Sequence, residues 1–164
     1  MAGYDDPDTA KLVAELQQEY VVRYGGPDAT SVGIEEFAAP LGLFLVGYVD
    51  GVPVCCGGWR GRTEDGQFAD GDAELKRMYV VEGFRGGGLA RELLAELERT
   101  ARAAGRRRLV LETGTRQPEA IALYESYGYT KIPKFGVYRD AEGSRCFAKT
   151  LTGQEDSGAD LRAG

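Results

Sequence analysis

The sequence predicts a mixed α/β fold in which helices flank a central sheet. Apolar residues recur at helical spacing in separate stretches, β-rich apolar segments flank a tight-turn dipeptide, and one long strand runs through a glycine-rich turn into a helix. A chain of 164 residues can bury one sizeable core without disulfides or a metal. We therefore expect a single domain over residues 1–152, followed by a polar, disordered tail over 153–164.

The first half of the chain predicts two helical stretches and a β-hairpin. The expected elements are helices over 9–24 and 31–37, strands over 43–49 and 53–59, and a glycine-rich loop over 61–71. Asp8 is the expected cap of the first helix, because a carboxylate can accept hydrogen bonds from first-turn amides. Asp50-Gly51 separates the two strands, and this dipeptide favours the tight primed turns of antiparallel hairpins.

The second half predicts four strands and two longer helices. The strands are expected over 73–81, 109–112, 129–132 and 144–149, and the helices over 89–104 and 117–127. Gly105 and Gly128 follow the two helices. Glycine commonly ends a helix, because it adopts a left-handed conformation without steric cost.

The composition excludes several kinds of catalytic site. Because the chain contains no histidine, a Ser-His-Asp triad and histidine-ligated zinc are unavailable, and acid-base chemistry falls to Asp, Glu, Lys, Tyr or water. The three cysteines are predicted to be reduced packing residues, with no metal bound. Cys55 and Cys56 are adjacent in an expected strand, so their side chains point to opposite faces.

Charge and hydropathy give expectations about partners and location. The net charge of −6 disfavours nucleic-acid binding and suits a cationic acceptor better. No apolar run approaches the roughly 18 residues of a spanning helix, so no membrane association is expected. Residues 1–7 are acidic where a secretory signal would be basic and then apolar, and we therefore expect a cytoplasmic protein.

The glycine-rich turn at 82–88 is the motif most typical of a ligand site. A strand, a glycine-rich turn and a helix aim backbone N–H groups and the helix dipole at phosphate. A Walker A loop would need Gly-Lys-Ser/Thr, but Leu89 and Ala90 follow Gly88. A dinucleotide fingerprint would need a small residue where Arg91 stands. A purely structural turn is the remaining alternative to a phosphate site.

The segment Arg85-Gly86-Gly87-Gly88-Leu89-Ala90 resembles motif A of the GNAT superfamily, which wraps the pyrophosphate of coenzyme A. The preceding strand, 74–80, is similar to the central strand of that family. The later segment 117–129 is similar to its motif B. The resemblance covers roughly residues 43–151. Two residues depart from it, since Glu82 stands where the family often has proline and Gln117 where it commonly has asparagine.

The resemblance implies a twisted, mostly antiparallel sheet whose central strands separate in a V, with acetyl-CoA as co-substrate and no metal. The cofactor-binding residues that it implies are Met78, Tyr79, Val80, Arg85, Gly86, Gly87, Gly88, Leu89, Ala90, Arg91, Gln117 and Tyr124. Strand backbone at 78–80 would pair with the pantetheine arm, and a strand amide near Met78 would bind the developing oxyanion.

Two catalytic roles follow from the resemblance. Glu74 is the candidate base that removes a proton from the ammonium group of the acceptor. Its alternative role is that of a charge partner for Lys76 or Arg77. Tyr124 is the candidate acid that protonates the leaving thiolate, and its alternative role is packing within an apolar helix stripe.

The implied activity is N-acetyl transfer to a primary amine of a small molecule, by direct transfer in a ternary complex. A protein or peptide N-acetyltransferase and a non-catalytic acyl-CoA sensor are the alternatives, and a homodimer is possible. The acceptor site is expected between the first two helices and residues 133–144. Its candidate residues are the aromatic Tyr24, Phe37, Trp59, Phe135 and Tyr138 and the acidic Glu35, Glu36 and Asp140.

Overall fold

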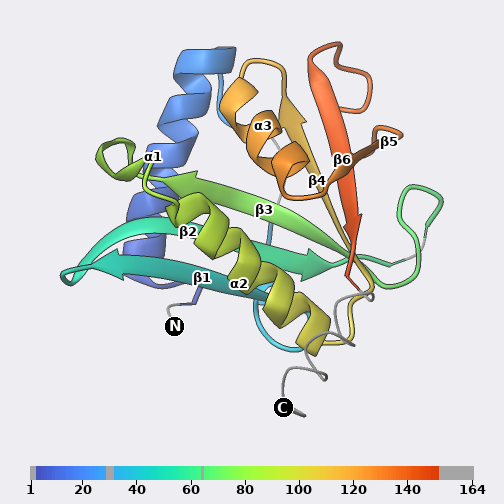
Figure 1. Cartoon of the computed structure of the whole chain (residues 1–164), viewed down its shortest axis with the longest axis horizontal. Coiled ribbons are helices and arrows are strands. Elements are labelled where there is room, and N and C mark those ends of the chain that lie inside the picture. Colours follow the sequence, from blue (N-terminus) through green and yellow to red (C-terminus); the bar gives the residue numbers. More distant parts are fainter. Residues whose placement is uncertain (1–2, 29–31, 64, 152–164) are drawn as a thin grey trace.

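A six-stranded sheet forms the centre of the protein, with α2 in front of it and α1 behind it in the view of Figure 1. The computed structural model describes residues 3–28, 32–63 and 65–151. The helical elements are α1 (Pro7–Tyr24), η1 (Ile34–Phe37), η2 (Glu82–Phe84), α2 (Leu89–Ala103) and α3 (Pro118–Ser126). The strands are β1 (Gly42–Val49), β2 (Val52–Gly61), β3 (Asp72–Val80), β4 (Arg108–Gly114), β5 (Thr130–Ile132) and β6 (Ser144–Thr150).

The strands are ordered β1-β2-β3-β4-β6-β5, and every neighbouring pair except β3 and β4 is antiparallel. The β1–β2 hairpin turns at Asp50 and Gly51, whose φ angles are 50° and 78°. Positive φ at both positions is what a type I′ turn requires, so the dipeptide sets the register of this hairpin.

The parallel pair of β3 and β4 is short. It joins Asp72, Ala73 and Glu74 to Arg108, Leu109 and Val110, and the pairing ends there although both strands continue. The strands therefore separate after Glu74 and Val110. This confirms the predicted V in a mostly antiparallel sheet.

Apolar side chains pack on both faces of the sheet. On one face, Leu94 and Leu97 of α2 belong to a core cluster with Leu109, Leu111 and Phe147 of the sheet. The indole N–H of Trp59 donates to Thr100 Oγ1 at 3.0 Å, which ties β2 to α2. The other face is covered by two further clusters, one made of Leu12, Phe37, Phe44 and Cys56 and the other of Phe68, Val110, Phe135, Cys146 and Ala148.

The ends of two helical elements differ from the prediction. Helix α1 begins at Pro7 rather than at residue 9, and its N-cap is Asp6, whose Oδ1 accepts from the Asp8 amide at 2.8 Å. Proline suits this position because it has a fixed φ and no amide hydrogen to leave unpaired. The stretch expected over 31–37 is a single 3₁₀ turn, η1, and Ser31 lies outside the described residues.

The expected tail, 153–164, also lies outside the described residues. Within the described part of the chain, none of the helices combines the length and the apolar character that crossing a bilayer requires.

Candidate active site

A cavity of about 1120 Å³ opens where β3 and β4 separate. Its walls include β3 from Leu75 to Val80 and β4 from Leu111 to Gly114. Residues of α1 and α3, Tyr138 and residues 141–145 also line it. Because the two strand edges no longer pair with each other, their backbone groups can bind an extended ligand laid between them.

The glycine-rich turn forms one end of this cavity. Gly86 and Gly88 have φ angles of 84° and 90°, a conformation that L side chains rarely adopt. Gly88 is the N-cap of α2 and supplies no side-chain cap, so the first-turn amides of this helix are available to an anion. Together with the positive end of the helix dipole, they form a site suited to a diphosphate.

The residues predicted to bind the cofactor come together here. All of them except Gly87 line the cavity, namely Met78, Tyr79, Val80, Arg85, Gly86, Gly88, Leu89, Ala90, Arg91, Gln117 and Tyr124. Arg85 donates through Nε to the Val80 carbonyl at 2.8 Å, and its guanidinium also pairs with Glu19 of α1. Arg91 donates to Ser126 Oγ at 2.7 Å. Contacts with β3, α1 and α3 therefore hold Arg85 and Arg91 in place beside the turn.

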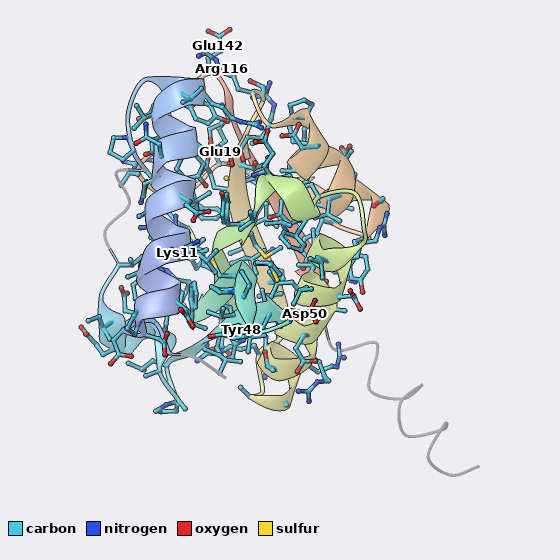
Figure 2. All side chains as sticks on the ribbon, turned by 90° about the vertical axis from the view of Figure 1, so that its left-hand side faces the viewer. Lys11, Glu19, Tyr48, Asp50, Arg116 and Glu142 are labelled. Atoms are coloured by element: carbon cyan, nitrogen blue, oxygen red, sulfur yellow. The ribbon has the colours of Figure 1, made fainter. Side chains whose placement is uncertain are left out.

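The end of α1 is tied to the start of α3 beside the cavity. Arg23 and Arg116 each donate to the backbone carbonyl of the other, at 2.9 and 2.8 Å, and Arg23 pairs with Glu119 at 2.7 Å. Gln117 Nε2 donates to the Tyr24 hydroxyl at 3.1 Å. Figure 2 shows Arg116 at the C-terminal end of α1, with Glu19 on the side of this helix that faces the rest of the molecule.

A bulge in β3 directs charged side chains into the cavity. The register between β2 and β3 shifts between Cys56 and Gly58, and Arg77 has a φ of 61°. Such a conformation is costly for a residue other than glycine, and bulges often re-aim side chains next to active sites. As a result the consecutive residues Lys76 and Arg77 both contact the Asp28 carboxylate.

Glu112 of β4 lies in the cavity wall and was not among the predicted site residues. Its Oε2 accepts from the Ser144 hydroxyl at 3.0 Å. Burial raises the pKa of the Glu112 carboxyl to about 7, against the lowering effects of the Ser144 hydrogen bond and of Lys76. A carboxyl with this pKa can accept and release a proton near neutral pH. The sequence signal was a lone acidic residue that follows the apolar run Leu109–Leu111.

Tyr124 of α3 lines the same cavity and is 6% exposed. Its ring packs edge-on against Tyr129, with 5.6 Å between the ring centroids. Burial raises the pKa of the Tyr124 hydroxyl, so the group stays protonated over the physiological range. This is the state that a proton donor requires.

Glu74, the expected base, lies outside the cavity wall. It belongs to the last residue pair before β3 and β4 separate, where the sheet is still closed. Its Oε1 accepts from Arg60 Nε and Nη2 at 3.1 and 3.0 Å, and Arg62 lies 3.7 Å away. Glu74 is therefore a buried charge partner, although its partner is Arg60 and not Lys76 or Arg77.

Of the expected acceptor residues, only Tyr24 and Tyr138 line the cavity. Phe37, Trp59 and Phe135 are buried in the core clusters instead. The acidic candidates, Glu35, Glu36 and Asp140, lie outside the cavity wall, and Glu36 pairs with Arg60 at 3.1 Å.

Comparison with known proteins decides the family. The sequence model of the acetyltransferase (GNAT) family matches residues 10–129. This protein belongs to the GNAT family. A relative of the GNAT chain is the IAA acetyltransferase of Azospirillum brasilense, 37% identical over 128 residues that cover 78% of this chain and 80% of that protein. An uncharacterized N-acetyltransferase of Escherichia coli is 32% identical and covers 78% of each.

Solved structures share the GNAT fold. A structure from Klebsiella pneumoniae, described as an acyl-CoA N-acyltransferase, has a TM-score of 0.72 and 29% identity, and covers 92% of this chain and 94% of that one. The PaiA N-acetyltransferase of Thermoplasma acidophilum, solved in complex with coenzyme A, has a TM-score of 0.62 at 16% identity, over 87% and 92% of the two chains. The match to the family model and to the acetyltransferase relatives shows that the protein is an N-acetyltransferase that uses acetyl-CoA.

The residues of the cavity fit this GNAT co-substrate. The uncapped amides at Gly88 suit the diphosphate, because an anion satisfies donors that the helix leaves unpaired. A Cβ added at Gly86 or Gly88 would meet nothing within 4 Å, so open space surrounds the turn. The edge of β3 over Met78–Val80 offers backbone N–H and C=O groups to the pantetheine arm of coenzyme A, which contains amides.

Proposed function

We propose that this enzyme transfers an acetyl group from acetyl-CoA to a primary amine of a small molecule, directly within a ternary complex. The observation that carries the proposal is that Glu112 and Tyr124 line one cavity, at the place where β3 and β4 separate. Acetyl-CoA supplies an activated thioester. A proton acceptor for the amine and a proton donor for the thiolate are the remaining requirements of the reaction.

Glu112 takes the role of the base. A typical alkylammonium has a pKa near 10, so the acceptor must lose a proton before its nitrogen can attack. The Glu112 carboxylate, whose pKa is about 7, accepts this proton directly or through one water. Its hydrogen bond from Ser144 holds the carboxylate in the wall of the cavity.

Tyr124 takes the role of the acid. Its protonated hydroxyl is positioned by the packing of its ring against Tyr129. The backbone edge of β3 near Met78 offers an amide to the negative charge that develops on the carbonyl oxygen.

Direct transfer is favoured over an acyl-enzyme. Cys55, Cys56 and Cys146 are buried and lie outside the cavity wall. Burial raises the pKa of all three thiols, which disfavours the reactive thiolate.

The test is the release of coenzyme A, followed with a thiol reagent, from acetyl-CoA and a panel of primary amines and short peptides. We expect turnover with small amines. Turnover confined to peptides would favour a protein acetyltransferase. Acetyl-CoA binding without turnover on any acceptor would favour a sensor and contradict the proposal.

A further inference from the structure

The cavity holds buried charges at the point where β3 and β4 separate. Lys76 Nζ lies 3.1 Å from Asp28 Oδ2, and Arg77 contacts the same oxygen. The Tyr138 hydroxyl donates to Asp28 Oδ1 at 3.1 Å. The side chains of Lys76, Arg77 and Asp28 are only 9%, 5% and 9% exposed. Burying a charge costs desolvation free energy unless the charge is paired, so charges buried at a ligand cavity suggest a role in binding.

Strand register places Lys76 beside the proposed base. Glu74 and Val110 form the last pair of the parallel ladder, and Lys76 and Glu112 each lie two residues further along. Side chains two residues apart share a face of a sheet, so Lys76 and Glu112 face the same side across the start of the V. The charge of Lys76 accordingly lowers the pKa of Glu112, and that of Asp28 raises it.

Lys76 can bind a second anion without leaving Asp28 unpaired. The Asp28 carboxylate also contacts Arg77 and Tyr138, so it keeps partners when the Lys76 ammonium turns toward a ligand. Two cations of the cavity wall, Lys76 and Arg77, contact Asp28, and the charge of Lys76 also acts on Glu112. A polyamine would bring further positive charge against these cations, whereas a carboxylate next to the amine would complement them.

We propose that the acceptor is an amino acid, whose carboxylate binds the Lys76 ammonium while its amino group lies at Glu112. The inference rests on the proposed function, since it names the acceptor class of that site. Tyr20 of α1 lines the cavity close enough to Asp28, Arg77 and Glu112 to feel their charges, and its ring favours an apolar or aromatic side chain. The overall negative charge of the chain favours a cationic acceptor, whereas the paired charges of the cavity favour a zwitterion.

The first experiment compares acceptors that differ only at the carboxylate. L-phenylalanine, L-leucine and L-methionine are each tested against the corresponding amide and decarboxylated amine. We expect kcat/KM for the best amino acid to exceed that for its two analogues by about 10- to 100-fold, the usual effect of a hydrogen bond to a charged group. Equal or better turnover of the amide or amine would overturn the proposal.

The second experiment changes the lysine. Both proteins are compared on the high-pH plateau, where Glu112 is deprotonated with or without the Lys76 charge. There Lys76→Met should lower kcat/KM for the amino acid by about 10- to 100-fold, mainly through KM, and that for the amide by much less. Lys76→Arg should retain the preference. Lys131→Met, at an exposed lysine of β5 outside the cavity, is the matched control and should change neither. An equal loss on all acceptors in Lys76→Met, measured on this plateau, would overturn the carboxylate site.

Calorimetry with the CoA-saturated protein separates this inference from the proposed function. Tighter binding of the amino acid than of its amide, lost in Lys76→Met, supports the carboxylate site even if no acceptor is acetylated. In that case the proposed catalysis fails and the binding inference stands. Equal affinity for the amino acid and its amide would overturn the carboxylate site. If either compound is nevertheless acetylated, the proposed catalysis still stands.

Discussion

At the scale of single residues, Glu112 determines how the reaction depends on pH. Its carboxyl must be deprotonated to act as a base, so the rate should rise with pH below about 7 and level off above it. Lys76, Asp28, Glu74 and Ser144 all influence this titration. Glu112→Gln should lower kcat by about 100-fold or more and remove the rise. The measurement is kcat against pH for the unmodified enzyme and for Glu112→Gln. If kcat of the variant still rises with pH below about 7, Glu112 is not the base.

Ser144→Ala provides a graded companion to that measurement. The Ser144 hydroxyl donates to Glu112 Oε2 and lowers the pKa of this carboxyl. Removing the hydroxyl should therefore move the rising limb of the rate profile to higher pH while the plateau persists. A shift toward lower pH would contradict the assigned hydrogen bond.

The pKa of Glu112 also has a consequence for stability. Because the folded protein holds this proton more tightly than the unfolded chain does, the contribution of Glu112 to folding becomes less favourable as pH rises from about 4.5 to about 7. Glu112→Gln should therefore raise the free energy of unfolding by about 1–3 kcal/mol at pH 8 and by much less at pH 5. Urea denaturation at both pH values measures this, and an equal effect at both would exclude the raised pKa.

Tyr124→Phe tests the proton donor while it keeps the ring packed. We expect kcat to fall by about 10- to 100-fold, with an unchanged Kd for acetyl-CoA and an unchanged melting temperature. Tyr129→Phe is the matched control, because the Tyr129 hydroxyl donates to Glu98 at 2.8 Å outside the cavity. That variant should lose stability and retain kcat. The reverse pattern would assign Tyr124 to packing alone.

At the scale of elements, the glycine turn depends on one backbone conformation. Gly88 has a φ of 90°, so Gly88→Ala should cost about 1–2 kcal/mol in strain and misalign the first-turn amides of α2. We expect the KM for acetyl-CoA to rise about tenfold or more. Gly87 does not have a positive φ and an added Cβ there meets nothing within 4 Å, so Gly87→Ala is the matched control. Similar KM values for the two variants would contradict the geometry.

Elements could be predicted from the sequence where the signal is local. The spacing of Leu93, Leu94 and Leu97 fixed α2, and Asp50-Gly51 fixed the hairpin, because helix faces and tight turns are set by nearby residues. The choice between Glu74 and Glu112 could not be made in this way. It depends on where β3 and β4 stop pairing, and that register is set by packing between residues distant in the sequence.

At the scale of the whole molecule, the sheet has two halves that are joined by only the short β3–β4 ladder. The ion pair of Arg23 with Glu119, beside the cavity, also links α1 to α3. A ligand bound along both strand edges would join the halves more firmly. Coenzyme A at 100 times its Kd should stabilise the fold by about 2.7 kcal/mol and raise the melting temperature by about 5–10 °C.

Hydrogen exchange can show where that stabilisation arises. Residues 75–80 and 111–114 line the gap between the strands, and some of their amides pair with β2 or β6 instead of facing it. Coenzyme A should slow the exchange of the amides that face the gap more than that of the β1–β2 hairpin, whose strands already pair with each other. In Gly88→Ala the same ligand concentration should protect these amides less, because fewer molecules are occupied. Protection confined to the helices, with the two strand edges unchanged, would mean that the ligand does not lie in the V and that the stabilisation comes from the glycine turn alone.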